Sequence, residues 1–158
     1  MRVPPQNLEA EQALLGAILS NNRALEKVSE FLHAECFANP VHGKIYDACR
    51  FYIEQGRIAD PITLKAFFEG DNALKEVGGA SYLAELAAAS TGIINAADYG
   101  RQILDRYVRR QMIALGTDIV NDAFAISIDE EAMAQVEHAE KRLYEIANSG
   151  ETVGGPQQ

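Results

Sequence analysis

The segment from Asn95 to Phe124 constrains the fold of this chain most strongly. It contains no proline and only two glycines, Gly100 and Gly116. Apolar residues recur along it at intervals of three and four, which is the spacing of one face of an α-helix. A continuous helix of this length extends about 45 Å at 1.5 Å per residue. The pattern therefore predicts one long helix over residues 95–124.

A second helix is predicted after a short break in this pattern. Residues Ser127 to Glu130 read Ser-Ile-Asp-Glu, which is the pattern of a capping box, and helical spacing then continues to about Asn148. Two long helices with so short a connection must lie antiparallel. The sequence thus predicts an antiparallel helical hairpin over residues 95–148.

The two predicted helices of the hairpin carry complementary apolar faces. The face of the first helix covers an arc of about 80° at 100° per residue, and the second helix offers apolar residues at spacings of three or four. We expect these faces to pack together, because each large side chain that becomes fully buried contributes about 1.5–3 kcal/mol. The packing residues are Leu104, Val108, Met112, Leu115 and Ile119 on the first helix and Ala132, Val136, Ala139, Leu143 and Ile146 on the second.

Another apolar row lies on the long helix, about 100° or more away from this face. It consists of Ile113, Val120 and Phe124. One neighbouring helix cannot cover both faces, and a monomeric protein rarely leaves such a patch exposed to water. The short connection at residues 92–95 limits folding of the preceding part over the far end of the hairpin. We therefore expect this row to form an interface with another subunit.

The residues before the hairpin predict about five short helices around one core. An N-cap residue followed by proline starts two of them, at Asn39-Pro40 and Asp60-Pro61. Glycines such as Gly56 can end them. The other helices are expected after Asn7, from Asn21 or Asn22 to about Leu32, and from Ala80 to Ala89.

Strand signals are nearly absent, so the expected fold class is all-α with three parts. Residues 1–94 form a globular helical subdomain, and residues 95–148 form the hairpin, which mediates oligomerisation. Residues 149–158, Ser-Gly-Glu-Thr-Val-Gly-Gly-Pro-Gln-Gln, have the composition of an interdomain linker. This linker is expected to have led to a further domain.

The charge of the chain bears on its partners. A formal net charge of −9 disfavours DNA as a primary ligand, because DNA-binding proteins meet this polyanion with clustered Lys and Arg. Interleaved acidic residues favour ion pairs at the one basic cluster, with Asp98 and Asp105 on the same helix and Glu140 and Glu145 on the next. Contact of this cluster with nucleic acid or a partner stays open, since tyrosines lie within it. The cluster consists of Arg101, Arg106, Arg109 and Arg110.

No metal site is predicted. His33, Cys36, His42 and Cys49 carry zinc-binding groups, but their spacing does not match the paired motifs of zinc sites. Buried cysteines are common in any core, which accounts for these residues more simply.

No catalytic site or cofactor is predicted within this chain. The G-x-x-x-x-G-K-[ST] phosphate loop is absent from the sequence, and no serine has a recognisable nucleophile context.

Two cysteines are too few for a disulfide framework, and no segment has the length and apolar character of a membrane span. A cytoplasmic location without membrane contact is expected.

Several short motifs resemble, in order and spacing, the N-terminal domain of the bacterial replicative DNA helicase, the DnaB family. Together they cover nearly all of residues 4–148, and one departure is Thr91-Gly92, where the family often has Thr-Pro. The motifs are Val-Pro-Pro-Gln-Asn-Leu-Glu-Ala-Glu-Gln-Ala-Leu-Leu-Gly at residues 3–16, Phe37-x4-His42-x2-Ile45 followed by Gly56, Asp60-Pro-Ile-Thr-Leu64, Gly78-Gly-x2-Tyr-Leu83 with Leu86, Asn95-x3-Tyr99, and Ala139-Glu-x2-Leu143-Tyr-x-Ile146.

The resemblance implies that this chain is the collar domain of a hexameric, ATP-dependent DNA helicase. In that family the N-terminal domains pair through their hairpins, and three pairs form a collar that guides single-stranded DNA and docks a DnaG-type primase. The implied partners are thus a second copy in a dimer, a hexamer built as a trimer of dimers, the primase, and single-stranded DNA in the ring. ATP and Mg²⁺ would serve the motor domain of the full-length protein. Two alternatives stay open: a free-standing helical adaptor, and a direct single-strand binder through the cluster from Arg101 to Arg110.

Overall fold

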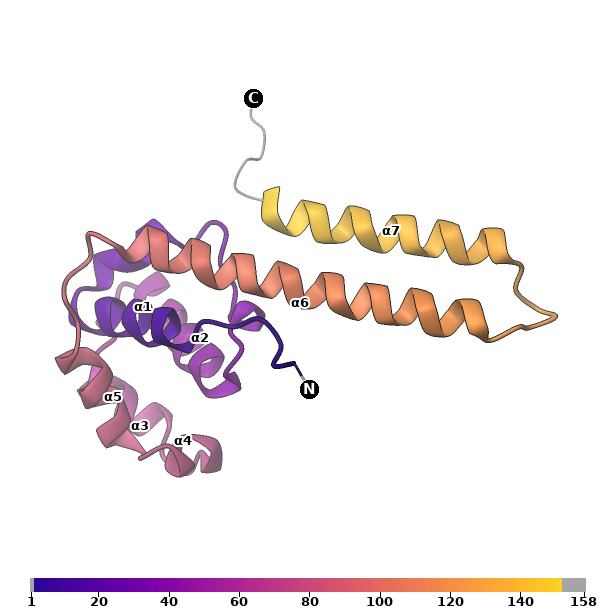
Figure 1. Cartoon of the computed structure of the whole chain (residues 1–158). Coiled ribbons are helices and arrows are strands. Elements are labelled where there is room, and N and C mark those ends of the chain that lie inside the picture. Colours follow the sequence, from indigo (N-terminus) through magenta and orange to yellow (C-terminus); the bar gives the residue numbers. More distant parts are fainter. Residues whose placement is uncertain (1, 152–158) are drawn as a thin grey trace.

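The computed structural model describes residues 2–151, and this part of the chain contains helices and no strands. A globular group of short helices lies at one end, and a long two-helix hairpin extends from it (Figure 1). The all-α prediction is confirmed. In chain order the elements are α1 (Leu8–Ser20), the 3₁₀ helices η1 (Asn22–Lys27) and η2 (Ala34–Cys36), α2 (Pro40–Glu54), α3 (Pro61–Phe67), α4 (Asn72–Glu76), α5 (Ala80–Ala88), α6 (Ala96–Phe124) and α7 (Ala132–Glu151).

The helix starts follow the capping signals of the sequence. The side chain of Asn7 accepts a hydrogen bond from the backbone N–H of Ala10 at the start of α1. At α3, the Asp60 carboxylate accepts from the N–H of Thr63 at 2.8 Å, and the Thr63 hydroxyl accepts from the N–H of Asp60 at 2.9 Å. These bonds satisfy N–H groups that the first helical turn leaves free, so each cap fixes the residue at which its helix begins.

The globular part is built around α1, which packs against α2, α5 and α6. Leu14, Leu15 and Ile18 of this helix are completely buried. The crossing of α1 and α5 is so close that a Cβ atom at Gly16 would overlap the carbonyl oxygen of Leu86. Glycine at this position therefore sets the distance between the two helices.

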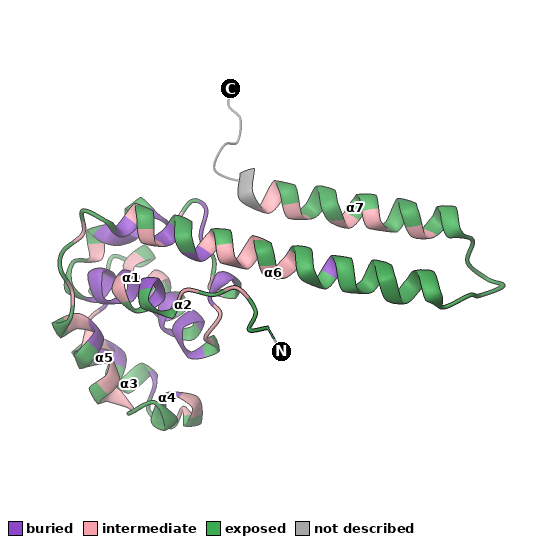
Figure 2. Ribbon diagram, in the orientation of Figure 1, coloured by how far each residue is buried: buried purple, intermediate pink, exposed green. Residues whose placement is uncertain are grey.

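Helix α6 belongs to both the globular part and the hairpin. Its first turns are in the core, where Ala96 and Ile103 are buried and a Cβ atom at Gly100 would lie 2.5 Å from a methyl group of Val28. Beyond this region α6 leaves the core and most of its residues are exposed, as are most residues of α7 (Figure 2). The two helices run antiparallel (Figure 1), as the sequence predicted.

The segment after α1 differs from the predicted helix that ended near Leu32. It forms the short 3₁₀ helix η1, capped by the side chain of Asn21, and then turns. Its first residue also makes a tertiary contact: the Asn22 amide donates to the carbonyl of Ala59 at 2.7 Å and accepts from the N–H of Ala59 at 3.0 Å. This contact ties η1 to the loop before α3.

The start of α7 also differs from the prediction. The expected capping box at Ser127 does not form, since the Ser127 hydroxyl accepts from the N–H of Asp129 in a tight local turn. The helix instead begins at Ala132. At its other end α7 includes Ser149 to Glu151, which were expected to be linker, and the remaining residues of that segment lie outside the described part.

Candidate partner-binding surfaces

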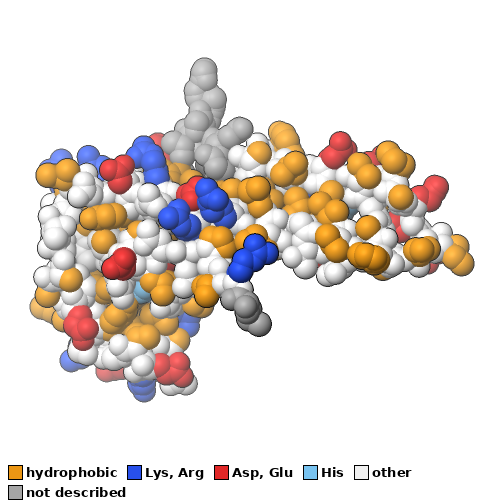
Figure 3. Space-filling model, in the orientation of Figure 1, with side chains coloured by type: hydrophobic (Ala, Val, Ile, Leu, Met, Phe, Trp, Pro, Cys, Tyr) orange, Lys and Arg blue, Asp and Glu red, His pale blue; other side chains and the backbone are white. Residues whose placement is uncertain are grey.

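The apolar row of α6 lies on the surface of the hairpin. Ile113 and Val120 are each 54% exposed, and Phe124 is 84% exposed. At 100° per residue this row lies roughly half a turn away from Leu115 and Ile119, which face α7. Helix α7 therefore cannot cover it. The space-filling view shows hydrophobic side chains distributed along the hairpin (Figure 3).

The hairpin helices leave an apolar groove of ≈ 390 Å³ between them. Leu115 is buried, whereas Met112, Ile119, Val136 and Leu143 remain about half exposed. The groove residues include Leu115, Ile119, Ala132, Val136, Ala139 and Leu143 of the predicted packing set. The two faces thus meet without excluding water fully.

The remaining residues of the predicted packing set lie closer to the globular part or the end of α7. Leu104 packs against the globular core. Val108 and Met112 line a groove beside Pro5, and Ile146 is partly buried. Polar contacts complete the pairing of α6 and α7, because Arg142 forms an ion pair with Asp118 at 2.5 Å.

Within the arginine cluster, the ion pairs are made with acidic residues of α6 itself, rather than with Glu140 or Glu145 of α7. Arg106 and Arg109 both bind the Asp105 carboxylate, at 2.7 and 2.9 Å. The hydrogen bond from Arg109 is the main cause that lowers the pKa of Asp105. Arg101 lies 3.8 Å from Asp98.

Arg110 has a different environment from the other three arginines. Its guanidinium donates to the backbone carbonyl of Pro5 at 2.8 Å and to that of Cys36 at 2.8 Å. It thereby joins α6 to the N-terminal arm, residues 2–7, and to η2. Both contacts are to backbone atoms of distant segments, so no sequence pattern identifies them.

The four residues considered as a metal set lie in different environments. Cys36 and Cys49 are buried free thiols, and burial raises the pKa of Cys49 to about 12. His42 is buried in a hydrogen-bond network, and His33 lies 3.5 Å from Arg50. Among the described residues no group of three or more His, Cys, Asp or Glu side chains could hold a metal ion.

The network around His42 is the polar centre of the globular part. Its Nδ1 lies 2.8 Å from Glu11 Oε1 and its Nε2 lies 2.6 Å from the Tyr82 hydroxyl. Glu11 also accepts from the N–H of Ala38 at 2.7 Å and from that of Asn39 at 3.3 Å. Glu11 and His42 are each 1% exposed, so this network connects α1, α2 and α5 inside the core. No pattern in the sequence predicted this network, although Glu11, His42 and Tyr82 all lie within the motifs shared with the helicase family.

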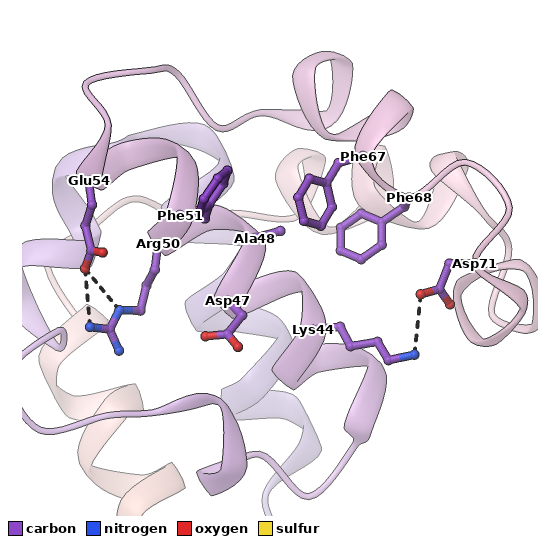
Figure 4. A pocket seen from close by; sticks show the side chains of 9 residues that line it. All are labelled: Lys44, Asp47, Ala48, Arg50, Phe51, Glu54, Phe67, Phe68 and Asp71. Carbon is purple, nitrogen blue, oxygen red and sulfur yellow. Dashed lines mark hydrogen bonds and ion pairs between the residues drawn. The ribbon is translucent and has the colours of Figure 1, made fainter.

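A second candidate surface is the groove between α2 and α3, with a volume of ≈ 720 Å³ (Figure 4). The rings of Phe51 and Phe67 are each 49% exposed, and their centroids are 6.4 Å apart. Charged pairs flank these rings, with Lys44 3.4 Å from Asp71 and Arg50 3.3 Å from Glu54. Aromatic rings within a charged rim are typical of protein-binding surfaces.

These features define an all-α domain with a globular part and a protruding helical hairpin that exposes apolar side chains. The chain belongs to the family of the DnaB-like helicase N-terminal domain, whose model matches residues 3–105. This finding confirms the resemblance of the sequence motifs.

Curated relatives with this domain are replicative DNA helicases. The chain is 48% identical over 147 residues to the replicative DNA helicase DnaB of Rickettsia felis, and 34% identical over 146 residues to that of Geobacillus stearothermophilus. These matches cover 93% and 92% of this chain but 30% and 32% of the relatives. The chain thus spans about a third of the length of these relatives.

Solved structures show the same fold. The N-terminal domain of DnaB helicase from Mycobacterium tuberculosis matches with a TM-score of 0.82 and 30% identity, over 90% of this chain and 99% of that chain. A structure described as a DnaB-like replicative helicase and its interactions with primase matches with a TM-score of 0.72 and 25% identity, over 91% of this chain and 32% of that chain. In the part of the chain that the structure describes, the helices are too short or too polar to cross a membrane.

Proposed function

We propose that this chain is the N-terminal collar domain of a hexameric replicative DNA helicase and that it pairs subunits through the α6–α7 hairpin. The observation that carries this proposal is the exposed row of Ile113, Val120 and Phe124 on a helix that extends away from the core. Membership of the DnaB-like N-terminal domain family supports the assignment to a replicative helicase. Three such pairs would form the hexamer.

Catalysis belongs, in this proposal, to a motor domain of the full-length protein. That domain would use ATP and Mg²⁺ to move along single-stranded DNA, which passes through the assembled ring. This chain would contribute assembly and partner binding, and no catalytic residue.

Self-association of the chain tests the proposed pairing. We expect sedimentation equilibrium to show a dimer that dissociates on dilution, and Ile113→Glu or Phe124→Glu to shift the equilibrium to a folded monomer. A carboxylate at either position would be buried without a partner in the dimer but solvated in the monomer. Asn121→Glu is the matched control, because it adds the same charge to the same helix about 80° from the row.

The outcome that contradicts pairing is a wild-type chain that stays monomeric at high concentration. Substitutions that unfold the chain, without a folded monomer by circular dichroism, would instead place the row in an intramolecular core. Either result removes the support that the exposed row gives to the proposal.

Docking of a DnaG-type primase is the second part of the proposed function. Its support is the similarity to the helicase structure described with its interactions with primase. Titration of the chain with the primase from the same source, followed by calorimetry, is the direct test. We expect saturable binding, and a chain that is folded and dimeric but gives no heat with primase would contradict this part alone.

A further inference from the structure

The N-terminal arm, residues 2–7, is fixed on α6 by the contacts of Arg110. The guanidinium bonds the carbonyls of Pro5 and Cys36, both at 2.8 Å, and so holds the arm where it leaves the globular part. Pro4 and Pro5 restrict the backbone of the arm, because the proline ring locks φ near −65°. The bond to the Pro5 carbonyl therefore also orients the residues of the arm that precede Pro5.

The fixed arm continues the apolar row of the hairpin. A groove of ≈ 400 Å³ lies between Pro5 and the side chains of Val108, Met112 and Ile113. A second groove of ≈ 390 Å³ is lined by Val3, both prolines and again Ile113. Val3 is 74% exposed, so the apolar surface extends from Ile113 onto the arm.

The two grooves share Pro5 and Ile113 and together form one composite groove. We propose that this composite groove receives Phe124 of a second copy of the chain. The inference rests on the pairing in the proposed function, and it adds the arm to the paired surface. Most homodimers have two-fold symmetry, in which residue i contacts residue j and residue j contacts residue i. The row from Ile113 to Phe124 extends about 16 Å along α6. A two-fold axis near its middle brings Phe124 of each copy opposite Ile113 of the other.

Phe124 and the composite groove match in their apolar character. Phe124 is the most exposed residue of the row, at 84%, and a phenylalanine gains free energy mainly by burying its ring. The two grooves that meet at Ile113 are lined mainly by proline, valine, isoleucine and methionine side chains, together with the charged residues Arg2, Asp105 and Arg109. Arg110 acts here as a positioning residue, because its donors are directed to the arm and not to the second copy.

Dissociation constants from sedimentation equilibrium test the role of the arm. We expect deletion of residues 2–5 to weaken self-association by about tenfold, and Arg110→Gln by a similar factor, because both leave the groove incomplete. The combined variant should be no weaker than the deletion alone, since two changes that act through one element are not additive. Arg101→Gln is the matched control, with the same change of charge at a position that does not bond the arm.

Disulfide trapping locates Phe124 of the second copy. Both native cysteines are buried, so a Val3→Cys chain mixed with a Phe124→Cys chain presents one exposed thiol on each. We expect mild oxidation to give a mixed dimer that joins residues 3 and 124. A dimer that joins only residue 124 to residue 124 would show that the two Phe124 positions lie beside each other, away from the arm. That result would overturn the inference.

The outcomes separate this inference from the proposed function. If Ile113→Glu dissociates the dimer while deletion of the arm and Arg110→Gln do not, the hairpin pairs subunits and the arm takes no part. If none of these changes alters association, the chain pairs through a surface other than the hairpin row, and both the inference and the proposed pairing fail. Circular dichroism of each variant ensures that loss of association is compared between folded chains.

Discussion

At the scale of single residues, two polar arrangements hold distant segments of this chain together. The Glu11–His42–Tyr82 network connects three helices inside the core, and Arg110 connects α6 to the arm and to η2. Both arrangements satisfy groups that would otherwise be costly to bury. Side chains far apart in sequence therefore determine how the elements are placed.

The His42 network makes a prediction about stability. We expect His42→Ala to lower the free energy of unfolding by about 3–5 kcal/mol, because it leaves the Glu11 carboxyl group buried without its main partner. Tyr82→Phe removes the hydrogen bond to His42 and the exposed one from the Gln12 amide, and should cost about 1 kcal/mol, mainly from the bond to His42. Urea denaturation measures both, and the exposed His138→Ala is the control. Equal effects of the three substitutions would show that the network contributes no more than a surface histidine.

At the scale of elements, the sequence predicted the helices whose ends are determined locally. Asn7, Asn39 and Asp60 cap their helices as expected, because a cap involves neighbouring residues only. The helix expected after Asn21 is present and capped by Asn21, but it is a 3₁₀ helix that ends at Lys27 instead of near Leu32. Helices α4 and η2 were not predicted. The apolar row of the hairpin could be read from helical periodicity, whereas the attachment of the arm could not. It depends on the carbonyls of Pro5 and Cys36, which side-chain patterns do not encode.

Helix packing gives a second prediction, in which the same substitution has opposite effects at two glycines. Gly16→Ala would place a methyl group against the carbonyl of Leu86, and we expect a loss of about 1–3 kcal/mol in stability. At Gly116, within α6, an added Cβ atom meets nothing within 4 Å. Gly116→Ala should therefore stabilise the chain by about 0.5–1 kcal/mol, through helix propensity alone. Thermal denaturation of both variants at low concentration checks the signs, and a tolerated Gly16→Ala would contradict the close crossing.

At the scale of the whole molecule, charge and shape favour protein partners over nucleic acid. The chain carries a formal net charge of −9, and its arginine cluster is engaged with Asp98, Asp105 and backbone carbonyls. The apolar surface is concentrated on the hairpin and in the α2–α3 groove. This distribution supports the proposed role of the domain in binding other proteins rather than DNA.

The charge distribution predicts weak binding of single-stranded DNA by this chain alone. We expect fluorescence anisotropy with a labelled oligonucleotide to show little binding at about 0.15 M salt, because few phosphates can be neutralised and counterion release is correspondingly small. The alternative of direct binding through the cluster predicts the reverse. Tight binding that Arg101→Gln and Arg109→Gln abolish would establish that alternative.

The continuity of α6 through core and hairpin has a mechanical consequence. Its N-terminal turns are clamped by α1 and η1, and its 29 residues run without a break to the tip. A helix of that length is about 43 Å long, so a rotation of the globular part by about 10° would displace the tip by about 7 Å. Because α6 is continuous, a small tilt of its first turns would be transmitted as a larger displacement to the far end of the hairpin.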